Sequence, residues 1–84
     1  MKYKNKIVLI TGSGSGIGKA AALAFSKEGG TIIVSDINEI NGVKTVSEII
    51  KNNGKASFFK TDVSNFDMVQ NLMDFIIEKY GRLD

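Results

Sequence analysis

Runs of strand-forming residues alternate with helical patterns along the whole chain. The first two runs consist mostly of β-branched aliphatic residues, which is typical of strands that are buried on both faces. The chain predicts strands at residues 7–10, 31–35 and 56–61 and helices at residues 17–28, 40–53 and 64–80. Because the connections are short, this alternation predicts an α/β fold in which parallel strands are joined by right-handed crossovers.

The composition fits a small globular protein and limits the kinds of catalytic and metal-binding groups that its residues can supply. The chain has 84 residues, which is one domain at most, and 43% of them are hydrophobic. It contains neither cysteine nor histidine, so these residues supply no disulfide bond, no thiolate and no imidazole. The acidic residues lack the spacing of a calcium-binding loop, and we therefore expect no metal site.

Charge and hydropathy bear on the expected location and partners. The net charge of +2 is too small to indicate a nucleic acid or a membrane surface as a partner. The apolar run at residues 7–10 is too short for a signal sequence, and no stretch is long enough to span a membrane. We therefore expect a cytoplasmic protein that binds neither nucleic acid nor membrane.

Several residues mark the expected helix boundaries. Gly29 is expected to end the first helix and Gly81 the third. Ser64 with Asp67 three positions later resembles a capping box, with Asp in place of the usual Glu or Gln, and would begin the third helix. Gly42 is expected to weaken the second helix.

A glycine-rich segment joins the first predicted strand to the first predicted helix. Residues 10–19 read Ile-Thr-Gly-Ser-Gly-Ser-Gly-Ile-Gly-Lys. The N-terminus of a helix has unpaired N–H groups and about half a positive charge from the helix dipole, which together favour a phosphate. Glycine allows an anion to reach the backbone because no Cβ stands in the way. This loop therefore predicts a nucleotide-phosphate site.

Two kinds of nucleotide loop compete for this segment. A P-loop requires glycine where the chain has Ser13, and a hydroxyl residue where it has Ala20. The dinucleotide fingerprint Gly-x-Gly-x-x-Gly/Ala is met by residues 16–21 in its alanine form. The preceding strand and the following helix favour the dinucleotide interpretation, and a P-loop phosphotransferase is the less favoured alternative.

An acidic residue follows the second predicted strand. Asp36 lies twenty residues after Gly16, where dinucleotide-binding folds place a carboxylate against the adenosine ribose. A carboxylate accepts hydrogen bonds from a free 2′-hydroxyl and repels a 2′-phosphate. The sequence therefore favours NAD over NADP as the cofactor.

These motifs together resemble those of the short-chain dehydrogenases/reductases. Residues 11–18 look like the Thr-Gly-x-x-x-Gly-Ile-Gly loop of that family, Asp36 like its acidic residue, Asp62-Val63 like its Asp-Val pair, and residues 80–84 like its lead into a fourth strand. The resemblance runs over the whole chain and implies a Rossmann-like three-layer fold. Residues 1–84 would form the first βαβαβα portion of an NAD(P)-binding domain, truncated before the fourth strand.

The resemblance also implies roles for individual residues. The backbone around Gly16 would approach the pyrophosphate, Asp62 would accept a hydrogen bond from the adenine amino group, and the Val63 backbone would help to hold the ring. NADP-preferring members often carry a basic residue at the position of Ser15 or Ile37, and neither is basic here. The candidate cofactor-binding residues are Thr11, Gly12, Ser13, Gly14, Ser15, Gly16, Ile17, Gly18, Asp36, Ile37, Asp62 and Val63.

Catalytic residues of that family are expected beyond Asp84. The resemblance implies hydride transfer between a nicotinamide cofactor and an alcohol or carbonyl carbon, with a Ser and a Tyr-x-x-x-Lys pair handling the proton. The tyrosines of this chain are Tyr3 and Tyr80, and neither has a lysine four residues later. We expect the cofactor-binding part of a longer, homo-oligomeric dehydrogenase acting on an alcohol or ketone, inactive by itself. A non-catalytic dinucleotide-binding or regulatory module is the alternative.

The expected sheet would have one open edge. In a doubly wound sheet the fourth strand pairs with the first, so a chain without it leaves the apolar residues 7–10 unpaired on one side. We therefore expect these 84 residues alone to self-associate through that edge.

Overall fold

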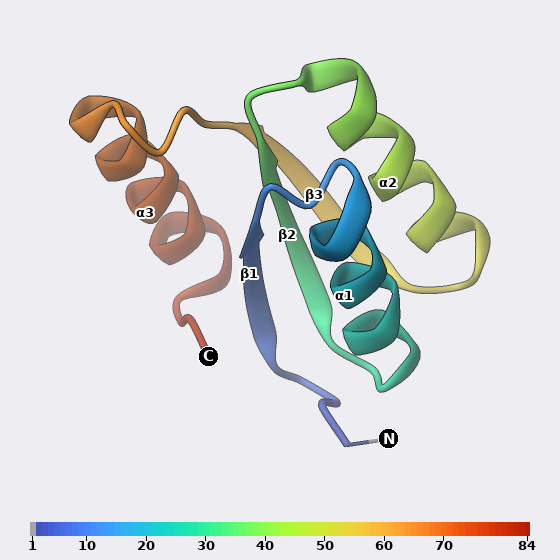
Figure 1. Ribbon diagram of the computed structural model, residues 1–84. Coiled ribbons are helices and arrows are strands. Elements are labelled where there is room, and N and C mark those ends of the chain that lie inside the picture. Colours follow the sequence, from blue (N-terminus) through green and yellow to red (C-terminus); the bar gives the residue numbers. More distant parts are fainter. Residues whose placement is uncertain (1) are drawn as a thin grey trace.

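The computed structural model describes residues 2–84 and shows three strands and three helices in alternation (Figure 1). In chain order the elements are β1 (Ile7–Thr11), α1 (Gly16–Lys27), β2 (Thr31–Asp36), α2 (Glu39–Lys51), β3 (Lys55–Lys60) and α3 (Phe66–Tyr80). The strands are all parallel and lie in the order β1-β2-β3. The predicted α/β fold with a parallel sheet is therefore confirmed.

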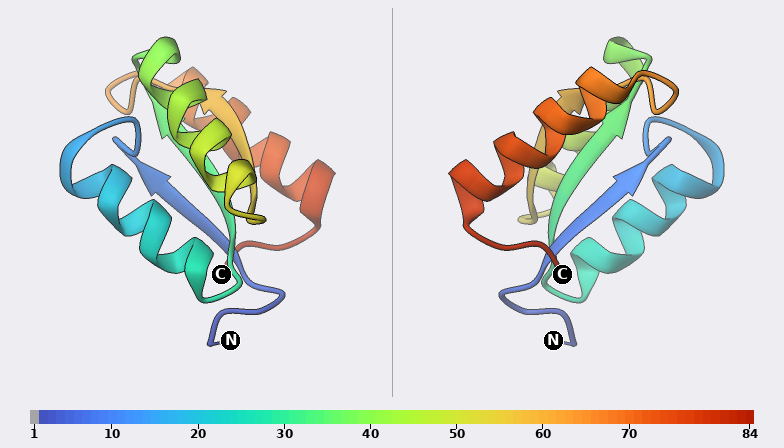
Figure 2. Two further views of the ribbon diagram at one scale, coloured as in Figure 1. Left: turned by 90° about the vertical axis from the view of Figure 1, so that its right-hand side faces the viewer. Right: turned by 90° about the vertical axis from the view of Figure 1, so that its left-hand side faces the viewer.

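The parallel register brings the carboxyl ends of the strands to one edge of the sheet. Thr11 pairs with Ser35, and Ser35 pairs with Phe59. The loops that follow β1, β2 and β3 therefore emerge side by side, as Figure 2 shows. These loops carry the residues that the sequence singled out.

Helices cover both faces of the sheet and form three layers. Helices α1 and α2 lie on one face and α3 on the other (Figure 1). The buried cluster under α1 and α2 contains Ala22, Ile32, Val34 and Ile49, and the cluster under α3 contains Ile7, Ile33, Leu72 and Ile76. Successive residues of β2 supply opposite clusters because strand side chains alternate between faces. Strand β2 is thus buried on both faces, as its uninterrupted apolar run predicts.

The start of α3 differs from the expectation. Asn65 is the N-cap, and its side chain accepts a hydrogen bond from the Met68 N–H at 3.1 Å. Ser64 instead donates its hydroxyl to Asp62. Asn and Ser are comparably good N-caps, so local preference alone does not rank these neighbours. At the other end of α3, Gly81 adopts a left-handed φ of 74° and ends the helix as predicted.

Gly42, predicted to weaken α2, proves to be required by packing. A Cβ at this position would overlap the ring of Phe58 on β3. The glycine therefore lets α2 lie close against the sheet. Close helix–sheet packing offsets the lower helix propensity of glycine.

No helix within residues 2–84 is long and apolar enough to cross a membrane.

Candidate functional site

The amino end of α1 lies at the carboxyl edge of the sheet and lacks a side-chain cap. Its N-cap is Ser15, whose side chain accepts no hydrogen bond from the first turn. By contrast, the side chains of Asn38 and Asn65 cap α2 and α3, and each of those helices has an acidic residue in its first turn. Helix α1 has none. The first-turn N–H groups of α1 and the positive end of its dipole are thus available to an anion.

The glycines of the loop serve two purposes. Gly12 and Gly16 have φ angles of 65° and 58°, in the left-handed region that favours glycine. A Cβ on either residue would project into open space, the space that a bulky anion needs to reach the backbone. A Cβ on Gly18 would instead overlap the carbonyl oxygen of Gly12. The first turn of α1 therefore packs directly against the loop.

Hydrogen bonds attach this loop to the end of β2. Ser13 is fully buried, and its hydroxyl donates to the Ile10 carbonyl oxygen at 2.7 Å and accepts from the Ser35 N–H at 3.1 Å. The next residue, Gly14, donates its N–H to Asp36 Oδ2 at 2.8 Å. Loop and carboxylate consequently form one hydrogen-bonded unit.

The Asp36 carboxylate is oriented by two backbone groups. In addition to the Gly14 bond to Oδ2, the Asn38 N–H donates to Oδ1 at 2.9 Å. An ionised carboxylate offers about four lone-pair positions, so each oxygen retains capacity for a further donor. This arrangement suits two neighbouring ligand hydroxyl groups, such as those of a ribose.

Asp62 begins the turn that follows β3. The N–H and the hydroxyl of Ser64 both donate to Asp62 Oδ1, at 2.9 and 2.6 Å. These bonds, the hydroxyl bond first, lower the pKa of the Asp62 carboxyl below its ordinary value of 3.8. The carboxylate is therefore ionised at neutral pH, and its second oxygen can accept a hydrogen bond from a ligand.

A shallow hollow runs along the ends of all three strands. Its volume is about 290 Å³, and it is lined by Thr11, Gly12, Asp36, Ile37, Thr61, Asp62 and Val63. Ile37 and Val63 expose 59% and 64% of their surfaces. Two apolar side chains and two carboxylates in one hollow provide a place for a flat ring that carries polar groups at its edge.

The structure places the predicted site residues in two adjoining groups, the glycine loop and the hollow. Ser13 differs from the rest, because its side chain lies beneath the loop rather than on its surface. Thr61 lines the hollow and was not predicted. It is 3% exposed, and its hydroxyl donates to the Phe59 carbonyl oxygen at 3.3 Å. Its position directly after a strand that ends at this edge is the feature that could have identified it.

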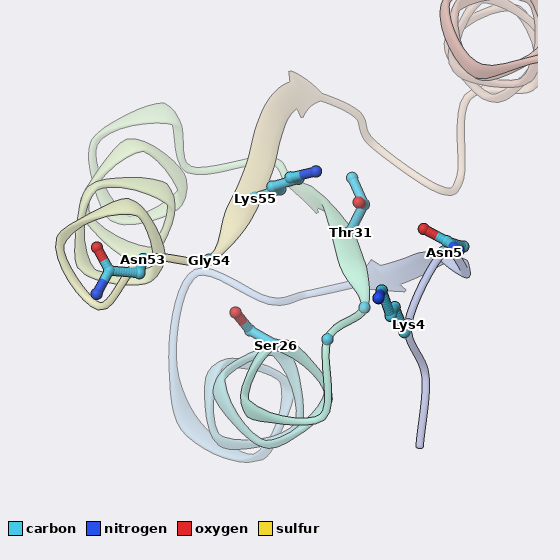
Figure 3. A pocket seen from close by; sticks show the side chains of 9 residues that line it. Lys4, Asn5, Ser26, Thr31, Asn53, Gly54 and Lys55 are labelled. Atoms are coloured by element: carbon cyan, nitrogen blue, oxygen red, sulfur yellow. The ribbon is translucent and has the colours of Figure 1, made fainter. Parts of the chain in front are cut away.

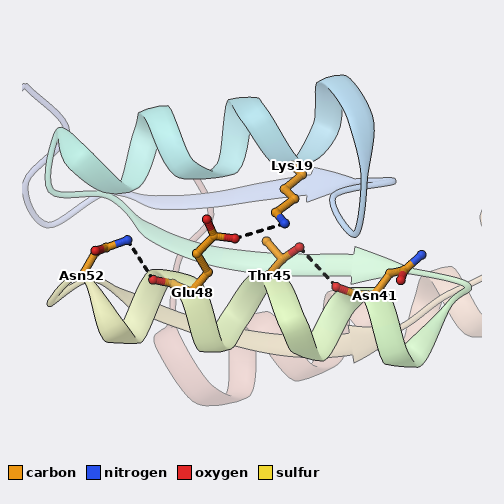
Figure 4. A network of polar contacts seen from close by, with 5 residues as sticks. All are labelled: Lys19, Asn41, Thr45, Glu48 and Asn52. Atoms are coloured by element: carbon orange, nitrogen blue, oxygen red, sulfur yellow. Dashed lines mark hydrogen bonds and ion pairs between the residues drawn. The ribbon is translucent and has the colours of Figure 1, made fainter.

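Lys19, the residue on which a P-loop would depend, points away from the loop. Its Nζ lies 3.0 Å from Glu48 Oε2 on α2 (Figure 4). The ion pair joins the two helices that cover the same face of the sheet. This geometry disfavours the P-loop alternative because the lysine of such a loop must reach the phosphates.

A second hollow lies at the opposite end of the sheet (Figure 3). It has a volume of about 200 Å³ and is lined by Lys4, Asn5, Ser26, Gly29, Gly30, Thr31, Asn53, Gly54 and Lys55. Here the helices end rather than begin. The Gly30 N–H donates to the Phe25 carbonyl oxygen at 3.0 Å, and the Gly54 N–H donates to that of Ile49 at 2.9 Å. The last turns of α1 and α2 are thus closed by their own backbone.

Within the described chain, residues 2–84, no group of three or more His, Cys, Asp or Glu side chains is arranged to hold a metal ion.

The fold and this edge of the sheet define a dinucleotide-binding region of the Rossmann type. The chain belongs to the short chain dehydrogenase family, whose sequence model matches residues 6–84. A 3β-hydroxysteroid dehydrogenase of Mediterraneibacter gnavus is 45% identical over 83 residues, which cover 99% of this chain and 30% of that protein.

Two solved structures show the same likeness. A hydroxysteroid dehydrogenase from Escherichia coli superposes with a TM-score of 0.96 at 36% identity, over 99% of this chain and 35% of that one. A 7α-hydroxysteroid dehydrogenase complexed with NADH and 7-oxo glycochenodeoxycholic acid superposes with a TM-score of 0.95 at 36% identity, over 99% of this chain and 32% of that one. The chain spans about a third of the length of these relatives and corresponds to the dinucleotide-binding region of the family.

Proposed function

We propose that this chain binds NAD and forms the cofactor-binding part of an oxidoreductase that acts on an alcohol or carbonyl group. The observation that carries the proposal is the bond from the Gly14 N–H to Asp36 Oδ2. It joins an uncapped helix N-terminus, suited to phosphate, to a carboxylate suited to ribose. Family membership supports the same assignment.

Each part of the cofactor has a group that fits it. The first-turn N–H groups of α1, at residues 16–18, would bind the pyrophosphate, which the open space beside Gly12 and Gly16 admits. Asp36 would accept hydrogen bonds from the adenosine ribose. Asp62 would accept one from the adenine amino group, and Ile37 and Val63, which line the same hollow, would contact the ring.

The chemistry divides between cofactor and protein. A bound nicotinamide dinucleotide supplies the centre that donates or accepts hydride. The residues of this chain bind that cofactor, orient its adenosine end and cover the base. The 84 residues contain no Tyr-x-x-x-Lys pair, so they supply no proton-transfer group of the kind the family uses. We propose that residues 1–84 form the first part of a longer NAD(P)-binding domain, because the relatives are about three times as long.

Asp36 supports NAD rather than NADP. Its charge opposes a 2′-phosphate, and neither Ser15 nor Ile37 supplies a positive charge beside it. Lys19, close by in the sequence, is directed to Glu48. The names of the hydroxysteroid dehydrogenase relatives support a secondary alcohol or its ketone as the substrate class. We also propose a cytoplasmic, homo-oligomeric protein.

Fluorescence titration with NADH, and with NADPH in parallel, tests this function. We expect saturable NADH binding that is tighter than NADPH binding, and an Asp36→Ala variant that loses this preference together with about tenfold in NADH affinity. Asp74→Ala removes an exposed carboxylate on α3 and is expected to bind both cofactors as the unmodified protein does. Equal NADH affinity with and without Asp36 would contradict the proposal. In a longer protein that contains these residues, NADH binding without oxidation of any alcohol in a substrate panel would favour the regulatory module.

A further inference from the structure

Ser13 combines full burial with a polar side chain in a loop. Strand β1 ends where Thr11 pairs with Ser35. Beyond that point the backbone turns away from the sheet, and Ser13 takes over the pairing. Its N–H donates to the Ser35 carbonyl oxygen at 3.2 Å, and its hydroxyl accepts from the Ser35 N–H at 3.1 Å. A side-chain oxygen thus occupies the place of a strand carbonyl.

The same hydroxyl also closes the turn on its own side. It donates to the Ile10 carbonyl oxygen at 2.7 Å, so it bridges β1 and β2 at the point where the glycine loop begins. A neighbouring attachment is the bond from Gly14 to Asp36, which lies one residue further along each segment. The hydroxyl therefore sets how far the loop lies from the Asp36 carboxylate.

We propose that Ser13 is a positioning residue for the dinucleotide. Its side chain is fully buried, so it would act through the loop rather than by contact with the cofactor. It holds the glycine loop on β2 so that the N–H groups of α1 and the carboxylate of Asp36 keep the separation that a single dinucleotide requires. This inference rests on the proposed function, because it concerns the same site.

Ser13→Ala tests the inference. The variant removes the bridge and leaves the Ser35 N–H buried without an acceptor, while the volume hardly changes. We expect the dissociation constant for NADH to rise about tenfold. We also expect faster amide hydrogen exchange across residues 11–18 in the cofactor-free protein, which reports the loop without any ligand. A dissociation constant within twofold of the unmodified protein would overturn the inference.

Two controls separate positioning from general destabilisation. Ser35→Ala makes the same chemical change at a fully buried serine whose hydroxyl has no hydrogen-bond partner within residues 2–84, and should leave NADH binding unchanged. Thr45→Val removes a buried hydroxyl that donates to the Asn41 carbonyl oxygen at 3.2 Å inside α2 (Figure 4). It should lower thermal stability without altering NADH affinity or loop exchange. If Thr45→Val weakened NADH binding as much as Ser13→Ala, the inference would be wrong.

The readouts also distinguish this inference from the proposed function. Failure of the unmodified protein to bind NADH contradicts the function, whereas an unchanged affinity in Ser13→Ala contradicts only the positioning role. Should Ser13→Ala fail to fold, Ser13→Cys keeps the shape and a weak hydrogen-bonding group. Its NADH affinity should then fall between that of the unmodified protein and a tenfold loss, and an unreduced affinity would count against the role of the hydroxyl.

Discussion

The two ends of the sheet contain similar kinds of residues, but the helix termini at each end differ in how their backbone groups are hydrogen-bonded. Each end has glycines, polar side chains and a hollow. At the amino end, the last turns of α1 and α2 close on themselves through bonds such as the one from the Gly54 N–H to the Ile49 carbonyl oxygen. At the carboxyl end, the first turn of α1 has neither a side-chain cap nor an acidic residue. Backbone N–H groups without a side-chain partner at a helix terminus, rather than a hollow by itself, therefore distinguish the candidate binding site from the other end of the sheet.

Strain is also distributed differently between the two ends. At the amino end the left-handed positions include two asparagines, Asn5 and Asn53, each with a φ of 67°. At the carboxyl end the left-handed residues are Gly12 and Gly16. Asparagine tolerates the left-handed conformation, so it is sufficient where the chain has only to make a turn. Glycine also leaves the backbone open at Gly12 and Gly16, where the proposed dinucleotide would approach.

The largest expected effect comes from a pair of glycine-to-alanine substitutions, one at each end of the sheet. Gly18→Ala should destabilise the protein by about 3 kcal/mol and abolish measurable NADH binding, because the new Cβ would overlap the Gly12 carbonyl oxygen. Gly54→Ala, which would overlap Ser26 Oγ and crowd Ile49, should lower stability without changing NADH affinity. Thermal unfolding followed by circular dichroism, with NADH titration well below the midpoint, measures both quantities. Loss of NADH binding in Gly54→Ala would remove the distinction between the ends.

A second test concerns the strained turn at the amino end. Asn53→Ala should cost about 1 kcal/mol, which lowers the unfolding midpoint by about 5 °C, because alanine tolerates a positive φ less well than asparagine. NADH affinity should not change. Asn53→Gly is the matched variant and should be at least as stable as the unmodified protein. A weaker affinity for NADH in either variant would show that this end contributes to the site.

The part of the carboxyl edge that is proposed to hold the adenine should give a smaller effect. Asp62→Ala removes an acceptor from an exposed position, so the dissociation constant for NADH should rise about threefold. Asp67→Ala removes a neighbouring charge in the first turn of α3 and should leave the constant unchanged. Isothermal titration with NADH provides the measurement, and indistinguishable constants for the two variants would exclude Asp62 from the site.

The smallest expected effect is on the ionisation of Asp62. The bonds from Ser64 favour the ionised form and lower the pKa of the Asp62 carboxyl. Their stabilisation is therefore present above pH 3.8, the ordinary pKa, and is lost as the pH falls through the lower pKa of the folded state. Ser64→Ala should raise the pKa of Asp62, measured by NMR titration of its carboxyl carbon. Ser47→Ala, an exposed serine on α2, should not, and an unshifted pKa in Ser64→Ala would refute the stated cause.

Some of the fold could be predicted because its determinants are local. The uninterrupted apolar run of β2 predicted burial on both faces, and the structure places Ile32 and Ile33 in opposite clusters. Parallel strands imply a common carboxyl edge, which is why Asp36 and Asp62 could be expected beside the glycine loop. For the same reason, the twenty-residue interval from Gly16 to Asp36 could be used to predict that the carboxylate lies near the glycine loop.

Other features depended on contacts between distant segments. Arg82 had no predicted role, and the structure pairs it with Asp84, whose N–H and carboxylate both bond to the Ile7 backbone at the open edge of β1. The Arg82 guanidinium, followed by the Ile7 N–H, lowers the pKa of the Asp84 carboxyl. The choice of Asn65 over Ser64 as the cap of α3 has a local cause instead, because the Ser64 hydroxyl donates to Asp62 two residues earlier.

The sequence by itself determined the alternation of strands and helices, the glycine loop at the start of α1 and the acidic residues at the end of β2 and after β3. These follow from periodicity and spacing along the chain. Only the tertiary structure decided that the Ser13 hydroxyl would continue the pairing of β1 with β2, that Gly14 would bind Asp36, and that Gly42 would lie against Phe58. The physical reason is that a hydrogen bond or a close contact requires the distance between two segments to be right to within a few tenths of an ångström, and packing sets that distance whereas residue order does not.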